Sequence, residues 1–118
     1  MNLFWCLCPN SNVYIEKTIP PLNMLIEEGC DIVIGTDSLA SNTELSILVE
    51  LKTLQFNFPD LTIMDLVRWA TLNGARSLGE EDQFGAIETG KNPGLLLLQN
   101  VDLQNMKLLP DSFVTRLI

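Results

Sequence analysis

The sequence contains no histidine, so it lacks the side chain that most often serves as a metal ligand and general base in proteins. Basic residues are also few, since Lys and Arg total 7 against 15 Asp and Glu, which gives a net charge of −8. A surface of this sign repels phosphate backbones and anionic lipid headgroups. We therefore expect neither nucleic acid nor a membrane as a partner.

Long hydrophobic runs are missing as well. The composition is 47% hydrophobic, yet no apolar stretch approaches the ~20 residues that are needed to cross a bilayer. The apolar amino-terminal segment has no basic residue ahead of it and no small-residue cleavage pattern after it, so it does not resemble a signal peptide. We expect a cytoplasmic protein.

Cysteines are few and odd in number: Cys6, Cys8 and Cys30. Cys6 and Cys8 would point to the same face of a strand, too close along one backbone for a comfortable disulfide. A Cys-x-Cys pair without a second pair or a histidine also falls short of the four ligands of tetrahedral zinc. The sequence therefore predicts reduced, buried thiols.

The first third of the chain has the pattern of a βαβ unit. Residues 3–8 form an unbroken apolar run, which predicts a strand that is buried on both faces. A short amphipathic helix should follow Pro20-Pro21 and end at Gly29, and residues 32–34 should form the next strand. The pattern favours an α/β fold with parallel strands and a right-handed crossover.

Two longer helices and a β unit are expected after this. A capping-box pattern at residues 41–44 predicts a helix through Phe56, and a second one at 62–65 opens a helix that ends at Gly79. From Gly85 onward, short extended stretches alternate with turn residues. The candidate domain boundary lies between residues 79 and 83.

Two parallel strands leave two open sheet edges. Unpaired main-chain groups at such edges are costly when they are shielded from water. We therefore expect the chain to be the carboxyl-terminal part of a larger protein, or to self-associate and so complete its sheet.

Asp37 is the strongest candidate for a functional residue. It follows the apolar run 32–34 and Gly35, which puts a carboxylate at the carboxyl end of a buried strand, where α/β folds carry their chemistry. A structural alternative stays open, in which Asp37 caps the strand end or pairs with a local Lys or Arg.

Four segments in order resemble the amidohydrolase superfamily. They are Cys8-Pro9-Asn10-Ser11-Asn12, Gly35-Thr36-Asp37-Ser38 with Ser41-Asn42, Ala70-Thr71-Leu72-Asn73-Gly74-Ala75, and Gly85-Ala86-Ile87-Glu88-Thr89-Gly90-Lys91. The branch with the greatest similarity deaminates guanine, cytosine and adenosine-type compounds or dechlorinates triazines. One departure is Gly94, which stands where the family commonly has an aspartate before an apolar strand.

The resemblance implies an architecture. Residues 1–79 would be the last two βα units of a (β/α)₈ barrel, with residues 3–8 as its seventh strand and 32–34 as its eighth. After the following helices, residues 80–118 would belong to a small composite β-sandwich.

The resemblance also implies a site. Asp37 would contact a divalent metal, zinc or iron, and take a proton from the metal-bound water, while Ser11 and Asn12 would border the pocket of a small-molecule substrate. An alternative for Ser11 and Asn12 is an Asn-rich turn that caps the next helix. The family's histidine ligands are absent, so the chain alone is expected to bind metal weakly and to be inactive.

Two functions are therefore open. The chain is either the carboxyl-terminal segment of a metal-dependent amidohydrolase that hydrolyses a non-peptide carbon–nitrogen bond, or a non-catalytic interaction module that self-associates through its open edges.

Overall fold

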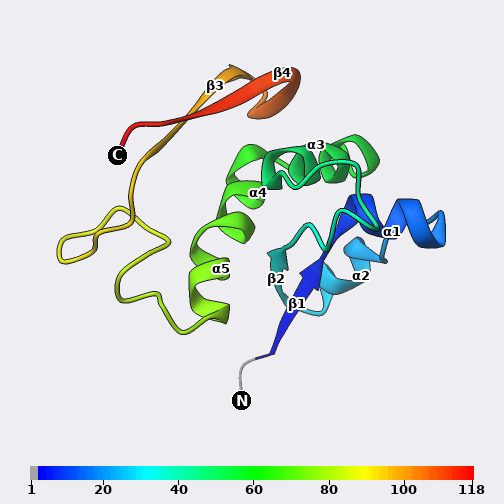
Figure 1. Ribbon diagram of the computed structural model, residues 1–118, viewed down its shortest axis with the longest axis horizontal. Coiled ribbons are helices and arrows are strands. Elements are labelled where there is room, and N and C mark those ends of the chain that lie inside the picture. The colour runs from blue at the N-terminus through cyan, green and yellow to red at the C-terminus, as the bar shows by residue number, and fades with distance from the viewer. Residues whose placement is uncertain (1–2) are drawn as a thin grey trace.

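The computed structural model describes residues 3–118, which form an α/β chain (Figure 1). Its elements are β1 (Phe4–Leu7), α1 (Pro9–Glu16), α2 (Leu22–Glu27), β2 (Asp31–Ile34), α3 (Ile47–Asn57), α4 (Ile63–Ala70), α5 (Leu72–Ser77), β3 (Leu96–Asp102) and β4 (Lys107–Arg116). Figure 1 shows α1 and α2 beside the first strand pair, and the β3–β4 hairpin beside α3. Within residues 3–118, no helix is long and apolar enough to cross a membrane.

The predicted βαβ unit is confirmed. β1 and β2 pair in parallel, from Phe4 opposite Asp31 to Leu7 opposite Ile34, and α2 gives way to Gly29 at a φ of 69°. The crossover holds one helix more than the sequence predicts, because α1 begins directly after β1. Pro9 is its first residue, a position at which a missing N–H and a fixed φ cost nothing.

The prediction that β1 is buried on both faces is wrong. Leu7 is buried in the core, but Trp5 is 50% exposed and Cys6 is also exposed. Trp5 and Leu7 share one face of the strand, so the core covers that face only at its carboxyl end, and within residues 3–118 the first sheet holds two strands. The Leu7 C=O accepts a hydrogen bond from the Gly35 N–H, so the main-chain groups of Leu7 face β2. Because alternate residues of a strand bond to opposite neighbours, the main-chain groups of Phe4 and Cys6 face the open edge.

The third helix starts later than its sequence pattern predicts. It begins at Ile47, and the Ser46 hydroxyl caps it by accepting a hydrogen bond from the Val49 N–H. Ser41 is buried in the preceding loop instead of opening the helix. The reason is that the side chain of its neighbour Asn42 is hydrogen-bonded back to the loop that follows β2.

The fourth helix begins as predicted. The side chains and main chains of Thr62 and Asp65 form a capping box at the start of α4. The expected single helix to Gly79 is broken at Thr71, whose φ of −120° and ψ of −80° separate α4 from α5.

The β unit is an antiparallel hairpin of β3 and β4. The stretch 85–87, expected to be extended, is not a strand. The hairpin is held against α3, because the Lys52 ammonium donates to the carbonyls of Pro110 and Ser112, and the Gln55 amide bonds the main chain of Leu108 in both directions.

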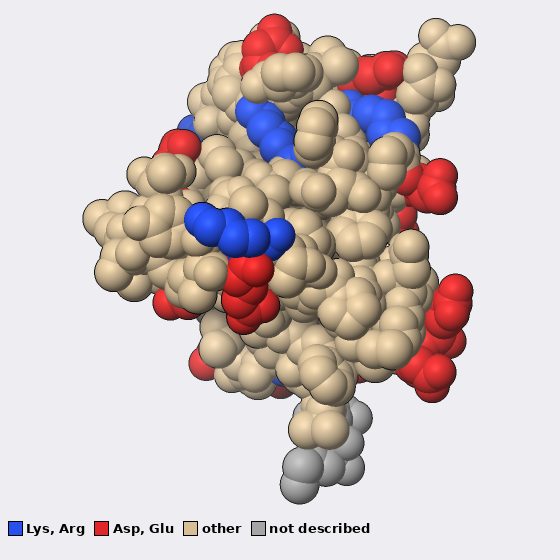
Figure 2. Space-filling model, turned by 90° about the vertical axis from the view of Figure 1, so that its right-hand side faces the viewer, with Lys and Arg blue, Asp and Glu red and all other residues tan. Residues whose placement is uncertain are grey.

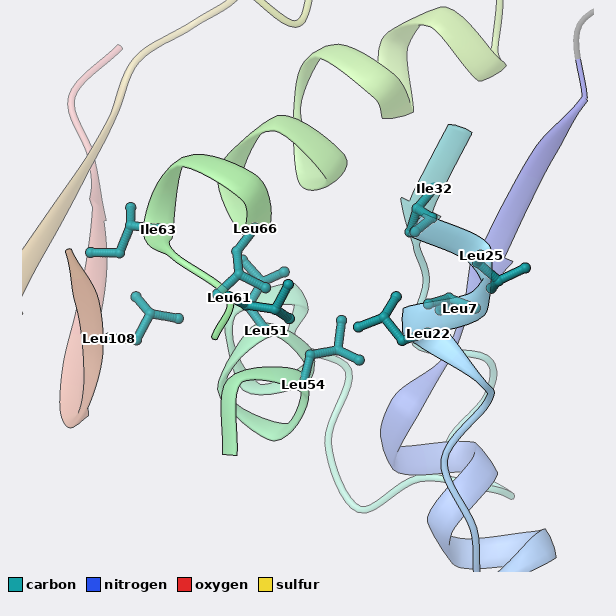
Figure 3. Packing of buried hydrophobic residues seen from close by; sticks show 10 residues of the cluster. All are labelled: Leu7, Leu22, Leu25, Ile32, Leu51, Leu54, Leu61, Ile63, Leu66 and Leu108. Atoms are coloured by element: carbon teal, nitrogen blue, oxygen red, sulfur yellow. The ribbon is translucent and has the colours of Figure 1, made fainter. Parts of the chain in front are cut away.

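Figure 3 shows the hydrophobic core, which runs from the hairpin through α3 and α4 to α2 and the first strand pair. Its buried members are Leu7, Leu22, Leu25, Ile32, Leu51, Leu54, Leu61, Ile63, Leu66 and Leu108. Trp69 packs against this cluster. Two other large aromatic residues are not in the core, because Trp5 is 50% exposed and Phe56 is 85% exposed.

Candidate functional site

The first turn of α1 and the loop after β2 meet at one edge of the sheet. Both follow the carboxyl ends of paired parallel strands, which lie side by side. The buried Ser11 hydroxyl donates a hydrogen bond to the Asp37 carboxylate over 3.2 Å between Oγ and Oδ2. Two of the predicted site residues, 26 positions apart in the chain, are therefore in contact.

Asp37 lies open to solvent at this edge. Its side chain is exposed and its φ is 57°, in the left-handed region that aspartate and asparagine adopt more readily than most residues. Among residues 3–118, the ion pairs are Arg76 with Asp31 and Lys91 with Glu88. The alternative of a salt bridge at Asp37 thus has no support, and its carboxylate is accessible for chemistry.

Ser11 and Asn12 lie within the first turn of α1, not in a turn ahead of the next helix. Asn12 is half-buried, and among the described residues its buried Oδ1 has no hydrogen-bond partner. A buried acceptor without a partner is costly. The Asn12 side chain therefore has an unused hydrogen-bonding group beside the site.

The loop after β2 is held by Asn42. Its amide nitrogen donates to the Thr36 carbonyl at 2.9 Å and to a Glu50 oxygen at 2.6 Å, and its Oδ1 accepts from the Glu44 N–H at 3.3 Å. The bonds to Thr36 and Glu44 are those of a side chain that caps the main chain of this loop. The contact with Glu50 was not found by sequence reasoning, because Glu50 lies in a helix whose pattern indicates only core packing.

Two cysteines, Cys6 in β1 and Cys8 at the start of α1, lie next to Gly35. A Cβ added to Gly35 would meet the Cys6 and Cys8 sulfurs at 3.0 and 3.3 Å. Burial, with Cys6 and the nearby carboxylates of Asp37 and Glu50 adding to it, raises the pKa of the Cys8 thiol to about 11. The cysteines are unbridged, as predicted, but Cys6 is exposed and not buried.

The described residues do not complete a metal site. Within residues 3–118, no group of three or more His, Cys, Asp or Glu side chains could hold a metal ion. Asp37 is one carboxylate donor, and zinc needs three or four protein ligands. Any metal at this edge would require ligands from other residues.

The chain is similar to known proteins over most of its length. A family model described as the amidohydrolase family matches residues 1–115. A 5-methylthioadenosine/S-adenosylhomocysteine deaminase from Moorella thermoacetica is 32% identical over 91% of this chain and 26% of its own length. A 5'-deoxyadenosine deaminase from Methanobrevibacter smithii is 34% identical, again over 91% of this chain and 26% of its own length.

Solved structures agree with these relatives. A zinc-bound adenosine deaminase from Xanthomonas campestris superposes on 79% of this chain and 23% of its own, with a TM-score of 0.70 and 34% identity. The guanine deaminase of E. coli superposes on 74% of this chain and 21% of its own, with a TM-score of 0.61 and 31% identity. The chain therefore spans about a quarter of the length of these proteins.

Proposed function

Because the chain belongs to the amidohydrolase family, we propose that it forms the carboxyl-terminal portion of a deaminase-like enzyme that hydrolyses a non-peptide carbon–nitrogen bond of a small molecule. The contact between Ser11 and Asp37 at the carboxyl edge of the parallel strand pair carries the proposal. Support also comes from the curated relatives, which deaminate adenosine-type compounds according to their names.

The proposed architecture follows the same logic. β1 and β2 are the last two strands of a (β/α)₈ barrel, and residues 1–79 belong to that barrel. Residues 80–118, which hold the antiparallel hairpin, contribute to a small β-sandwich. The parallel register of the strand pair and the crossover helices on its covered face support the barrel assignment.

Within this enzyme, Asp37 is the proposed proton acceptor for the attacking water. Its carboxylate is exposed at the strand end and is held by the Ser11 hydroxyl, so it is both accessible and oriented. Ser11 and Asn12 border the substrate, and the unpartnered Asn12 oxygen is available to a donor on it. A divalent metal, zinc or iron, needs ligands beyond this chain, and Asp37 is the one that this chain offers.

The open edge of the first sheet and the apolar surface near it are suited to bind a partner. Within residues 3–118, the outer edge of β1 is unpaired. Large apolar side chains are exposed on this strand, just before it and on the adjacent helices: Leu3, Trp5, Val13, Tyr14, Ile15, Met24 and Ile26. Figure 2 shows a face formed mostly by uncharged groups, with basic groups in its upper and left-central parts and most acidic groups toward its edges. We propose that this surface pairs with the remaining barrel strands, and that the chain otherwise self-associates through it.

A chimera tests the function. The segment of the Moorella thermoacetica relative that matches this chain is replaced by residues 1–118, and ammonia release from 5-methylthioadenosine is measured. We expect activity in the folded, metal-loaded chimera. Asp37→Asn should lower kcat by about 10²–10⁴-fold, because the proton acceptor is lost, while the exposed acid Asp60 offers the matched control Asp60→Asn.

Two results would contradict the proposal. One is a folded chimera with a normal zinc content and no turnover. The other is near-normal turnover in the Asp37→Asn variant, which would show that Asp37 does not accept the proton.

A further inference from the structure

Glu50 is a buried carboxylate on α3. It is 0% exposed, and the other buried residues of this helix are Leu51 and Leu54. Among residues 3–118 the ion pairs are formed by other residues, so no Lys or Arg balances it. A carboxylate in such a place is tolerated only when its oxygens are hydrogen-bonded.

Both of its oxygens have partners, and the partners come from two separate segments. Oε2 accepts from the Asn10 main-chain N–H at 2.9 Å, and Oε1 accepts from the Asn42 amide at 2.6 Å. Asn42 carries the link on to the loop after β2 by donating to the Thr36 carbonyl. Thr53, one turn further along α3, donates its hydroxyl to the Asn10 side chain.

These partners flank the candidate site. Asn10 directly precedes Ser11 in the first turn of α1, and Thr36 directly precedes Asp37. One carboxylate on a helix that packs into the core is thus tied to the main chain next to each of the two residues in contact at the sheet edge.

We propose that Glu50 is a positioning residue, which holds the segments after β1 and β2 in the relative placement that lets Ser11 orient Asp37. The inference rests on the proposed function for its catalytic consequence, whereas the tether itself is a property of this chain. Only a side chain with two acceptor oxygens serves both donors. An amide would turn its NH₂ group toward either the Asn10 N–H or the Asn42 NH₂, which are donors themselves.

Three variants of the full 118-residue chain test the tether. Glu50→Gln removes one acceptor, and Glu44→Gln removes the same charge from an exposed position in the preceding loop. The double variant Glu50→Gln/Asn42→Asp restores a donor–acceptor pair, because the new amide can donate to the new carboxylate while its oxygen still accepts from Asn10. Amide hydrogen exchange is followed in 8–16, 36–46 and α4.

We expect Glu50→Gln to speed exchange in 8–16 and 36–46 together, by about tenfold or more, and to leave α4 unchanged. Glu44→Gln should match the parent, and the double variant should recover protection in 8–16. Protection in 36–46 should recover only in part, because the Thr36 carbonyl loses its donor. Faster exchange confined to one segment, or an equal increase in α4, would overturn the tether.

The chimera separates positioning from simple support of the fold. With Glu50→Gln, kcat per folded molecule should fall on the order of 10²-fold with KM changed little, and the double variant should regain part of the loss. An unchanged kcat together with loosened segments would overturn the positioning role. If the parent chimera is inactive, the proposed function fails, and the exchange experiment still decides whether Glu50 holds the two segments.

Discussion

Gly85 is the position at which one methyl group should disturb the chain most. Its φ is 92°, and a Cβ built there would lie 2.8 Å from the Ala75 Cβ, 3.0 Å from the Leu72 Cα and 3.2 Å from the Thr71 carbonyl oxygen. Thr71 lies at the junction of α4 and α5, and Leu72 and Ala75 lie in α5. The absence of a side chain at Gly85 thus allows the 79–95 loop to lie directly on that helix.

Gly90 provides the matched control. Its φ is 90°, but a Cβ there would meet nothing within 4 Å. Gly90→Ala should therefore show only the cost of a left-handed alanine, about 1–3 kcal/mol. Gly85→Ala should show this cost and, in addition, that of forcing a methyl into a packed contact, about 1–3 kcal/mol.

The prediction concerns the difference between these two variants. Urea unfolding of the parent chain, Gly85→Ala and Gly90→Ala, analysed with a shared slope, should give a free energy of unfolding that is lower for Gly85→Ala than for Gly90→Ala by about 1–3 kcal/mol. Adding Ala75→Gly to Gly85→Ala removes the closest contact and should recover part of the difference, less the helix cost of a glycine, about 1 kcal/mol.

Equal destabilisation of Gly85→Ala and Gly90→Ala would refute the reasoning, because it would mean that the loop does not touch α5. The reasoning would fail in the same way if Ala75→Gly lowered the free energy of unfolding as much in the Gly85→Ala variant as in the parent chain. Either outcome would leave the resemblance between residues 85–91 and the family without a packing explanation.

Three further predictions follow from burial and from the donor set. Leu54 is 0% exposed whereas Phe56 on the same helix is 85% exposed, so Leu54→Ala should cost about 2–5 kcal/mol in urea unfolding and Phe56→Ala less than about 0.5 kcal/mol. Because the pKa of the Cys8 thiol is about 11, the rate of its alkylation by iodoacetamide in the native chain should be low at pH 8 and should rise up to about pH 11. A rate that levels off near pH 9 would contradict this. Calorimetric titration of the chain with zinc should show no submicromolar site, since the described residues form no ligand cluster.

Sequence periodicity was a good guide wherever an element packs on the core of this chain. The strand at 32–34, the short helix that ends before Gly29 and the capping box at 62–65 all have their signals within a few residues, and the structure forms each of them. Asp37 could be singled out for the same reason, because a buried strand followed by glycine and an acid is a local pattern.

The remaining elements depend on contacts that no local pattern records. The capping-box pattern at 41–44 failed because Asn42 bonds the Thr36 carbonyl and Glu50 instead of starting a helix. α1 was missed since Pro9 is also a common loop residue. Trp5 was expected in a core because apolar runs normally find cover on both faces, and the covering elements are not among residues 3–118.

Gly94 shows how a departure from a family pattern can have a local cause. Its φ is 74°, and a Cβ there would lie 3.3 Å from the Ile118 carbonyl oxygen. That carbonyl also accepts from the Leu95 N–H where the chain end meets the start of β3. An aspartate at this position would need a left-handed backbone beside a carbonyl, so glycine suits the turn that the structure forms.

The candidate half-site is organised entirely by residues of this chain. The residues of the Ser11–Asp37 contact, the Asn42 cap and the buried Glu50 all lie between positions 10 and 50. In the proposed enzyme, loops that are held by contacts within this chain lose less entropy when the rest of the barrel docks. Within residues 3–118, the outer edge of β1, by contrast, has no strand partner, so its main-chain groups are available to another strand. In the proposed enzyme, assembly at that edge should therefore depend on strand pairing and apolar burial, whereas the contacts around Asp37 come from within this chain.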